Sequence, residues 1–317
     1  MRLTVGIIQL LPEWEIIIQQ IGVSYTIISP VEFVSSDQFP VIIVTREGTQ
    51  PEKDILLHYL NSGGSILTEA NVGKWLFDIG TIPVFVNTVE PIEDPIFKGV
   101  LPGFIQTRLI LPRMGDVLES ESGRKLVQIY KHGKGTALIL PGGFSNTVLD
   151  TRVKRRNFPT QASHLPSERV ARRSKNTIRE VIQRSLEHLH FVRKLPFLSL
   201  SPFPEEKQSI FNFRIDTDFA SKEEINSLYK LCLNHNSCAT WFVETKTARD
   251  RMGQFTRMRN QEIGLHCHRH KISRNYSFNK SNIKEGCQIL KKANIPFRGF
   301  AAPYGEWNIP LAKTIEE

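Results

Sequence analysis

SIFNFRIDTDF (residues 209–219) and EIGLHCHRH (residues 262–270) are the stretches that decide the fold. Each begins as an apolar run that predicts a buried strand and ends in polar side chains. The first run ends in Asp216 and Asp218, and the second ends in three histidines. Parallel α/β folds gather their functional groups at the carboxyl ends of the strands. We therefore expect these side chains to lie together.

Helical patterns alternate with these strands along the chain. Ser221 and Glu224 have the spacing of a capping box, which predicts the start of a helix that ends near residue 233. An order in which strands and helices alternate is typical of a parallel α/β domain. The other expected elements are a strand at 238–245, a helix that ends at 257, a helix at 280–293, and a strand and turn at 297–305.

Asp218, His266 and His270 are the candidate metal ligands. One carboxylate with two imidazoles is a typical ligand set of catalytic zinc, and it leaves one position open for water. Residues four apart lie on one face of a helical turn, so the two histidines can converge on one ion. A fully extended chain would instead direct His268 to the same face, which makes a His266 and His268 pair the alternative. Cys267 would face away from His266 in a strand, and we expect it in the core.

These segments resemble the polysaccharide deacetylase family, also called the NodB homology domain or carbohydrate esterase family 4. RIDTD is similar to the family's first motif, and ATWFV resembles the strand that follows it. EIGLHCHRH is similar to the second motif, and FAAPYG is similar to the third. The resemblance implies a (β/α) barrel of the deacetylase type at residues 201–317. It also implies a metal-dependent hydrolase that removes acetyl groups from an N-acetylated polysaccharide or glycan precursor.

The resemblance implies a role for each residue of the first two motifs. Asp216 would be the catalytic base that activates water. Asp218, His266 and His270 would hold a divalent metal, expected to be Zn²⁺, with Co²⁺ or Ni²⁺ as alternatives. The metal would polarise the water and the acetyl carbonyl.

The third motif is expected to contribute to catalysis and to substrate binding. The backbone N–H of Tyr304 would stabilise the oxyanion, and Pro303 and Tyr304 would form one wall of the substrate groove. Trp307 is a candidate for stacking on a sugar ring, although an aromatic residue after a turn more often packs against its neighbours. The expected partner is an N-acetylated glycan.

Two features depart from the family pattern. Ala301 stands where the family has an arginine that pairs with the base, and Arg214 or Arg298 is a possible replacement. Family members continue past the third motif with further barrel strands and a late histidine, whereas this sequence stops at Glu317. We therefore expect a truncated domain with a partial barrel. The alternative function is a non-catalytic glycan-binding or assembly protein that retains an incomplete deacetylase barrel.

Residues 1–150 are expected to form a separate Rossmann-like domain, a parallel sheet with helices on both faces. The domain loosely resembles class I glutamine amidotransferases, because of its strand order and the closing segment ILPGGF. No cysteine precedes Cys232, so thioester chemistry is excluded. Pro141-Gly142-Gly143 is expected to form a tight turn and no phosphate or sugar cradle. The expected strands and helices are strands at 3–9, 25–29, 40–46, 65–70 and 135–143, and helices at 12–22 and 51–62.

Residues 151–200 are predicted to be a basic linker, with a loop at 150–166, followed by a helix at 167–192. Much of the net charge of +9 falls in this stretch, which can attract nucleic acid, anionic glycans or a membrane surface. A solvated linker and an exposed helix face explain the charge more simply. No nucleic-acid motif accompanies it, so nucleic acid is not the expected partner.

Composition predicts a soluble globular protein. Hydrophobic residues make up 40% of the chain and charged residues 23%. No apolar run is long enough for a membrane-spanning helix, and the N-terminus lacks the cleavage site of a signal peptide. The four cysteines lack zinc-knuckle spacing and are expected to be free thiols in a reducing cytoplasm.

Overall fold

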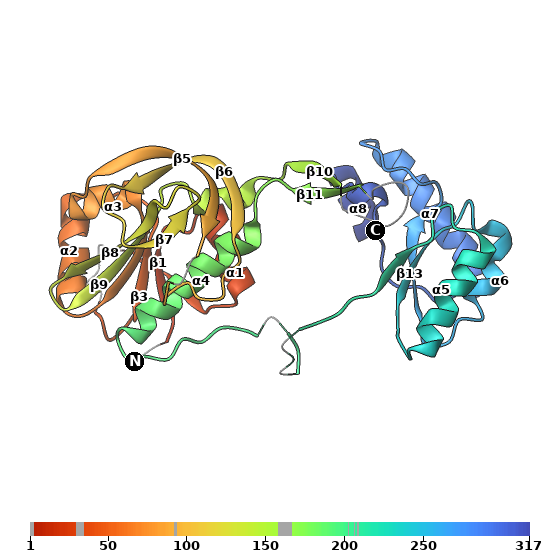
Figure 1. Ribbon diagram of the computed structural model, residues 1–317, viewed down its shortest axis with the longest axis horizontal. Coiled ribbons are helices and arrows are strands. Elements are labelled where there is room, and N and C mark those ends of the chain that lie inside the picture. Colours follow the sequence, from red (N-terminus) through yellow and green to blue (C-terminus); the bar gives the residue numbers. More distant parts are fainter. Residues whose placement is uncertain are drawn as a thin grey trace. The chain divides into compact units, whose positions relative to one another are not determined.

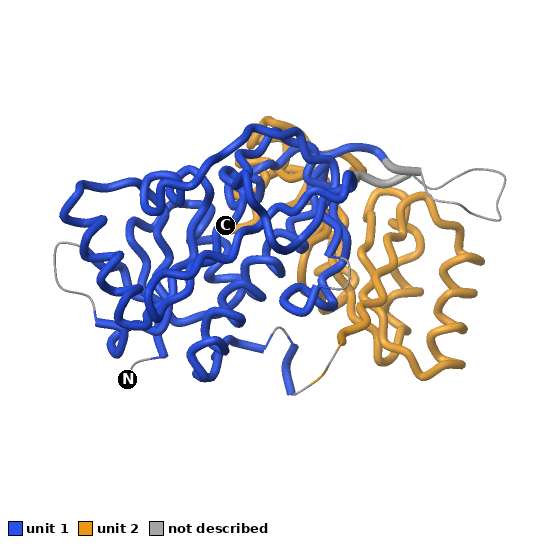
Figure 2. Tube along the Cα trace, turned by 60° about the vertical axis from the view of Figure 1, so that its left-hand side comes forward, with its two compact units in different colours: residues 1–156, 170–206 blue, residues 157–169, 207–317 orange. Residues whose placement is uncertain are grey.

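The chain forms two compact units in the computed structural model (Figure 2). Unit 1 comprises residues 1–156 and 170–206, and unit 2 comprises residues 157–169 and 207–317. Each unit has its own sheet, and both combine helices with strands. The predicted α/β class is therefore confirmed. The structure describes residues 3–29, 35–91, 94–157, 167–201, 203–205, 207 and 209–317.

Unit 1 is built on a nine-stranded sheet in the order β2-β1-β3-β4-β9-β8-β7-β5-β6 (Figure 1). The first five strands in this order, which are β2, β1, β3, β4 and β9, pair in parallel. The other four, which are β8, β7, β5 and β6, pair antiparallel with their neighbours. The bounds are Val5–Ile8 (β1), Tyr25–Ile27 (β2), Val41–Val44 (β3), Ser65–Glu69 (β4), Thr81–Glu90 (β5), Gly103–Pro112 (β6), Val117–Ser120 (β7), Lys125–His132 (β8) and Gly135–Leu140 (β9).

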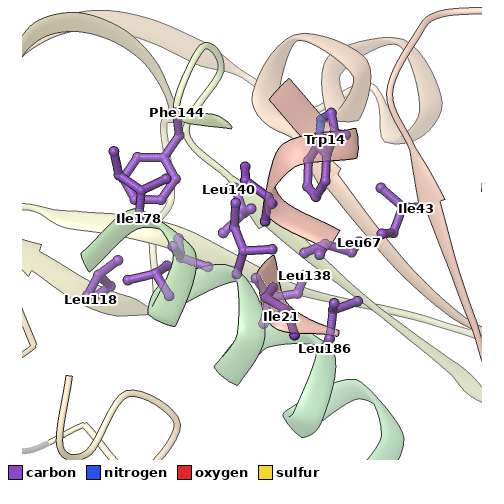
Figure 3. Close-up of a cluster of buried hydrophobic side chains, with 14 of the residues drawn as sticks. Trp14, Ile21, Ile43, Leu67, Leu118, Leu138, Leu140, Phe144, Ile178 and Leu186 are labelled. Atoms are coloured by element: carbon purple, nitrogen blue, oxygen red, sulfur yellow. The ribbon is translucent and has the colours of Figure 1, made fainter. Parts of the chain in front are cut away.

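Helices cover both faces of the parallel strands. Helices α1 (Pro12–Ile21) and α4 (Lys175–Phe191) pack on one face, and α2 (Gln50–Asn61) and α3 (Ala70–Phe77) pack on the other. Strand β3 is buried on both sides because its side chains alternate between two hydrophobic clusters. Figure 3 shows the larger cluster, to which these residues contribute: Trp14, Ile21, Ile43, Leu67, Leu118, Leu138, Leu140, Phe144, Ile178 and Leu186.

The five strands predicted in residues 1–150 pair in parallel, as expected. Residues 81–132 form four further strands that were not predicted and that pair antiparallel, so the sheet is mixed and not parallel throughout. In β6, buried and exposed side chains alternate, so one face of this part of the sheet meets solvent. Antiparallel sheets tolerate such a solvated face, whereas parallel sheets are normally covered on both faces.

The helix predicted to begin at Ser167 begins at Lys175 instead. Residues Ser167–Ala171 form strand β11, which pairs with β10 (Val153–Asn157) where a loop was predicted. Residues 158–166 of the predicted loop lie outside the described residues. Pairing with β10 therefore takes the first residues of the predicted helix into a strand.

The glycine pair after β9 forms a tight turn, as predicted. The carboxylate of Glu69, at the end of β4, accepts the backbone N–H groups of Gly143 and Ser145, each at 2.8 Å. Burial raises the pKa of Glu69. The chain's own carboxylate thus occupies the donors that a phosphate or sugar cradle would need.

Unit 2 contains the parallel strands β12 (Arg214–Asp216), β13 (Thr240–Glu244) and β14 (Glu262–Cys267). Residues 298–301, within the predicted fourth strand, lie beside β14 and form backbone hydrogen bonds with it. They contain only one isolated β-bridge, between Leu265 and Phe300, and so do not form a strand. The described residues of unit 2 therefore form a three-stranded sheet, and β12 and β14 are shorter than predicted. The helices of unit 2 are α5 (Lys222–Asn234), α6 (Met252–Phe255), α7 (Tyr276–Lys292) and α8 (Ile309–Glu316), and its short 3₁₀ turns are η2 (Arg249–Arg251) and η3 (Pro303–Gly305). A further 3₁₀ turn, η1 (Ser145–Leu149), belongs to unit 1.

Gly264 allows close packing in this sheet. A Cβ atom at this position would lie 2.5 Å from Cε1 of Phe242 on the neighbouring strand and 3.0 Å from the carbonyl oxygen of Arg298. The glycine of the Glu-Ile-Gly pattern is therefore required by packing on two sides.

Among the described residues, no helix has both the length and the apolar character needed to cross a bilayer.

The start of α2 is held by a capping box and an ion pair. Thr49 caps the helix, and its backbone N–H donates to the carboxylate of Glu52 at 2.6 Å. Arg46 Nη2 lies 2.8 Å from Glu52 Oε1. The hydrogen bond from Arg46 and then that from Thr49 lower the pKa of Glu52 to about 2.

We predict that Glu52→Gln destabilises unit 1 by on the order of 2 kcal/mol at neutral pH. Glutamine retains the capping geometry but loses the ion pair with Arg46. Because the pKa of Glu52 is lowered on folding, its stabilising effect is present above about pH 4.5 and disappears as the pH falls towards 2. Hydrogen exchange of the unit 1 strands at several pH values measures the difference. An effect equal to that of the exposed control Glu47→Gln, or one independent of pH, refutes the prediction.

Candidate metal centre

The two aspartates are positioned by the end of β12. Between them, Thr217 is buried, and its backbone N–H and its Oγ1 both donate to the carbonyl oxygen of Phe242, at 3.0 and 3.2 Å. Alternate residues of an extended segment point to the same side. Asp216 and Asp218 therefore point to the same side of the chain, and Thr217 between them is held to β13.

A β-bulge in β14 positions the histidines. Val243 pairs with Leu265, but Glu244 pairs with Cys267, so His266 is the extra residue. Bulges re-aim side chains and are common next to active sites. Cys267 has a φ of 129°, and the strand ends there. The chain then bends, and His270 lies back against His266.

The side chains of Asp218, His266 and His270 converge on one point. His266 Nε2 lies 3.1 Å from His270 Nε2 and 3.5 Å from Asp218 Oδ1, and His270 Nε2 lies 3.4 Å from Asp218 Oδ2. A tetrahedral zinc ion with bonds of about 2.0–2.1 Å separates its ligand atoms by about 3.3–3.4 Å. The two imidazole nitrogens are about this far apart, and the two Asp218 distances involve different carboxylate oxygens. One ligand atom from each residue lies within 4.8 Å of the others, so the three side chains are close enough to hold one such ion.

The protonation of His266 also suits a metal ligand. Its Nδ1 lies 2.8 Å from the carbonyl oxygen of Ala301, which only accepts hydrogen bonds, so Nδ1 carries the proton. The lone pair of Nε2 is therefore directed at His270 and Asp218. Burial lowers the pKa of His266, against the opposing effect of Asp216 and Asp218, and so favours the neutral form that binds metals. A lone pair facing a carboxylate is repulsive unless a positive charge lies between them, which a cation would supply.

The alternative pair of His266 and His268 is not formed. His268 Nδ1 lies 3.1 Å from Thr245 Oγ1, and its Nε2 lies 3.2 Å from Glu285 Oε1, so its ring is engaged elsewhere. Cys267 is fully buried, as predicted for a core residue, and burial raises the pKa of its thiol to about 12. Its Sγ donates to the carbonyl oxygen of Arg269, and Cys267 is not part of the ligand cluster.

Arg214 pairs with the predicted base. Its Nε lies 2.7 Å from Asp216 Oδ1, and its Nη2 lies 2.5 Å from Asp216 Oδ2. Arg214 and Arg298 were the two candidates to replace the arginine that the family has at position 301. Of these two, Arg214 makes the ion pair with Asp216. Ala301 contributes through its backbone instead, since its carbonyl oxygen orients His266.

Two exposed aromatic rings lie against the ring of His270. The ring of Tyr304 lies 4.6 Å and the ring of Phe219 lies 5.4 Å from the His270 ring, both edge-on. Both residues have a positive φ, 56° for Tyr304 and 61° for Phe219, which is costly for bulky side chains. Pro303, the first residue of the turn η3 that contains Tyr304, is buried, and Trp307 is 63% exposed. Sequence reasoning missed Phe219, although its position directly after Asp218 was a usable signal.

Comparisons with known proteins give only weak likenesses. No family model matches the sequence, and no curated protein matches it. Among solved structures, a carbohydrate esterase family 4 pseudoenzyme from Bacillus anthracis has a TM-score of 0.32 and 20% identity, and the match covers 38% of this chain and 46% of that one. A family 4 carbohydrate esterase from Streptomyces lividans has a TM-score of 0.30 and 18% identity, and the match covers 34% of this chain and 57% of that one.

A third solved structure belongs to another class. A β-galactosidase from Bacillus circulans has a TM-score of 0.40 and 10% identity, and the match covers 63% of this chain and 32% of that one. The chain thus spans between about a third and somewhat over half of these proteins. Likenesses of this size carry no argument about fold or activity. Membership of the deacetylase family therefore remains a proposal that rests on the motifs and on the geometry of the site.

We predict that the full chain binds one equivalent of Zn²⁺ or Co²⁺ and that His270→Ala weakens this binding by at least about 100-fold. The substitution removes one of three ligands, and titration of metal-free protein followed by Co²⁺ absorption measures the loss. His235→Ala, at an exposed histidine of the same unit, is the matched control. Equal affinity in His270→Ala and in the control would mean that the cluster binds no metal.

Proposed function

We propose that unit 2 is a metal-dependent hydrolase that removes acetyl groups from an N-acetylated polysaccharide or glycan precursor. The observation that carries this proposal is the convergence of the ligand atoms of Asp218, His266 and His270 near a second carboxylate, Asp216. Two imidazoles and a carboxylate favour Zn²⁺, with Co²⁺ or Ni²⁺ as alternatives. The sequence motifs support the substrate class.

The chain's own residues supply the base and the oxyanion donor. Asp216 accepts a proton from the attacking water, and its side chain is 33% exposed, so water and substrate can reach it. Arg214 fixes the orientation of this carboxylate through two hydrogen bonds. The backbone N–H of Tyr304 donates to the oxygen on which negative charge develops. The cation, when bound, supplies a Lewis acid that polarises the acetyl carbonyl and the water.

Aromatic side chains bind the sugar ring next to the reacting acetyl group. Phe219 and Tyr304 both meet the His270 ring edge-on, and Trp307 follows three residues after Tyr304. Exposed rings of this kind offer apolar faces to the C–H groups of a pyranose. Pro303 gives the wall of this groove a rigid turn. Backbone strain at two aromatic residues beside one candidate ligand supports a functional reason for their placement.

One observation favours the alternative of a non-catalytic glycan-binding protein. Both carboxylate oxygens of Asp216 accept hydrogen bonds from Arg214, so the base is less available to a water molecule. On this alternative the metal site and the aromatic rings bind a glycan without hydrolysing it. Metal-loaded protein that binds chitooligosaccharides but releases no acetate would support this function over the hydrolase.

We predict that Asp216→Asn lowers the rate of acetate release from chitooligosaccharides by about 10²–10⁴-fold and leaves metal content unchanged. The amide cannot accept the proton, but the three ligands remain. Asp218→Asn is the comparison variant, expected to lose both activity and metal. A metal-loaded Asp216→Asn protein with the activity of the unchanged chain refutes the assignment of the base.

We predict that Phe219→Gly raises KM for chitooligosaccharides by about 2–10-fold through the loss of ring contacts. Glycine suits the positive φ, so the melting temperature should stay the same or rise, and metal affinity should not change. Phe211→Ala is the control, because this exposed phenylalanine precedes β12 and so lies near the opposite end of that strand. A fall in stability with loss of metal would show that Phe219 supports His270 and does not contact the substrate.

A further inference from the structure

A pocket on unit 1 gathers arginines that are separate from the metal centre. It has a volume of about 280 Å³ and opens on the solvent face of β5 and β6. We call it the arginine pocket, and it is lined by Phe85, Asn87, Gln106, Arg152, Arg172 and Arg173.

Backbone hydrogen bonds fix the two chain segments that carry the arginines. The N–H of Arg172 donates to the carbonyl oxygen of Arg152 at 3.1 Å. Ser174 is tied to β6, because its N–H donates to the carbonyl oxygen of Phe104 and its Oγ accepts the N–H of the same residue, at 2.8 and 2.9 Å. The guanidinium groups therefore extend from a defined edge beside the sheet.

Asp150 orients two of the three guanidinium groups. Arg152 donates to both of its oxygens, at 2.9 and 2.8 Å, and Arg173 Nε lies 2.5 Å from Oδ2. The Arg173 and Asp150 side chains are only 11% and 10% exposed, so this pair is held firmly. Arg172 is exposed, and no carboxylate of a described residue forms an ion pair with it.

The pocket has a net positive charge, to which Arg108, the residue paired with Phe85 across β5 and β6, adds beyond the groups counted next. Lys154 lies over the Phe104 ring at 4.9 Å, and the carboxylate of Glu121 accepts N–H groups of Asn87. Three arginines and Lys154 against Asp150 and Glu121 leave two net positive charges. Guanidinium groups bind carboxylates and phosphates through paired hydrogen bonds.

The remaining lining groups suit a sugar. Phe85 is 59% exposed and offers one open ring face, and the side-chain amides of Asn87 and Gln106 can bond hydroxyl groups. A site for single-stranded nucleic acid instead follows the backbone over several nucleotides with a series of stacking rings. Here Phe85 is the one aromatic ring among the residues that line a single concave pocket.

We propose that the arginine pocket binds an anionic sugar, a pyranose that carries a carboxylate or a phosphate group. Arg172 and Arg152 bind the anionic group, Phe85 packs on the ring, and Gln106 bonds a hydroxyl. This goes beyond the proposed deacetylation and does not depend on it.

Calorimetric titration of the full chain at low and at physiological salt tests the proposal. The probes are a glucuronate disaccharide, glucose 6-phosphate, glucose and inorganic phosphate. The two anionic sugars distinguish a carboxylate from a phosphate ligand, and binding of either one supports the site. Glucose is expected to bind much more weakly than its phosphate, and affinity for the anionic sugars should fall as salt increases.

Two variants separate the anion contact from the ring contact. Arg172→Gln should weaken binding of the preferred anionic sugar by about tenfold or more. Phe85→Ala should weaken it by about 2–10-fold and leave inorganic phosphate unaffected. The control Arg124→Gln, at an exposed arginine of the same unit, should change affinity by less than about twofold. Arg172 and Phe85 are exposed, and equal melting temperatures check that the variants fold.

Three results would overturn the proposal. One is equal weakening by Arg172→Gln and Arg124→Gln, which indicates charge attraction without a site. Another is inorganic phosphate binding as tightly as either anionic sugar, with no effect of Phe85→Ala. The third is tighter binding of a single-stranded thymidine oligonucleotide than of either sugar, lost in Arg172→Gln, which would assign the pocket to nucleic acid.

Discussion

The hydrogen bond between His266 Nδ1 and the carbonyl oxygen of Ala301 is the contact on which the candidate metal centre depends. It joins β14 to the segment beside it, fixes the tautomer of His266 and directs the Nε2 lone pair at Asp218 and His270. The acceptor is a backbone atom, so the side chain of Ala301 can be small without loss of this function. The residue that departs from the family motif therefore still organises the ligands.

Local departures from regular structure surround this contact. The bulge at His266 and the positive φ of Cys267 end the alternation of β14 and turn the chain so that His270 returns to the cluster. Phe219 and Tyr304 also have left-handed backbones and stand beside the same imidazole. Such conformations cost about 1–3 kcal/mol each and persist where the surrounding structure holds them. The other non-glycine residues with a positive φ among the described part of unit 2 are the asparagines Asn236, Asn260 and Asn294, a residue type that tolerates this conformation.

The residue pattern predicted the local features of the structure, whereas other features depend on pairing between distant segments. The capping box at Ser221 and the buried strands of unit 1 follow from spacing and periodicity, and both are observed. The spacing of the motifs also predicted that Asp218, His266 and His270 meet. They do, but through a β-bulge and a bend of the chain and not through the helical turn that was expected. The exclusion of His268 and the start of α4 at Lys175 depend on contacts between distant segments, which no local pattern contains.

X-ray absorption at the zinc edge of the zinc-loaded full chain tests the central claim most directly. The account predicts a shell of nitrogen and oxygen atoms at about 2.0–2.1 Å, with the multiple scattering of two imidazoles. A sulfur atom at about 2.3 Å, which would make a cysteine thiolate a ligand, would contradict the account. A shell without imidazole scattering would contradict it equally.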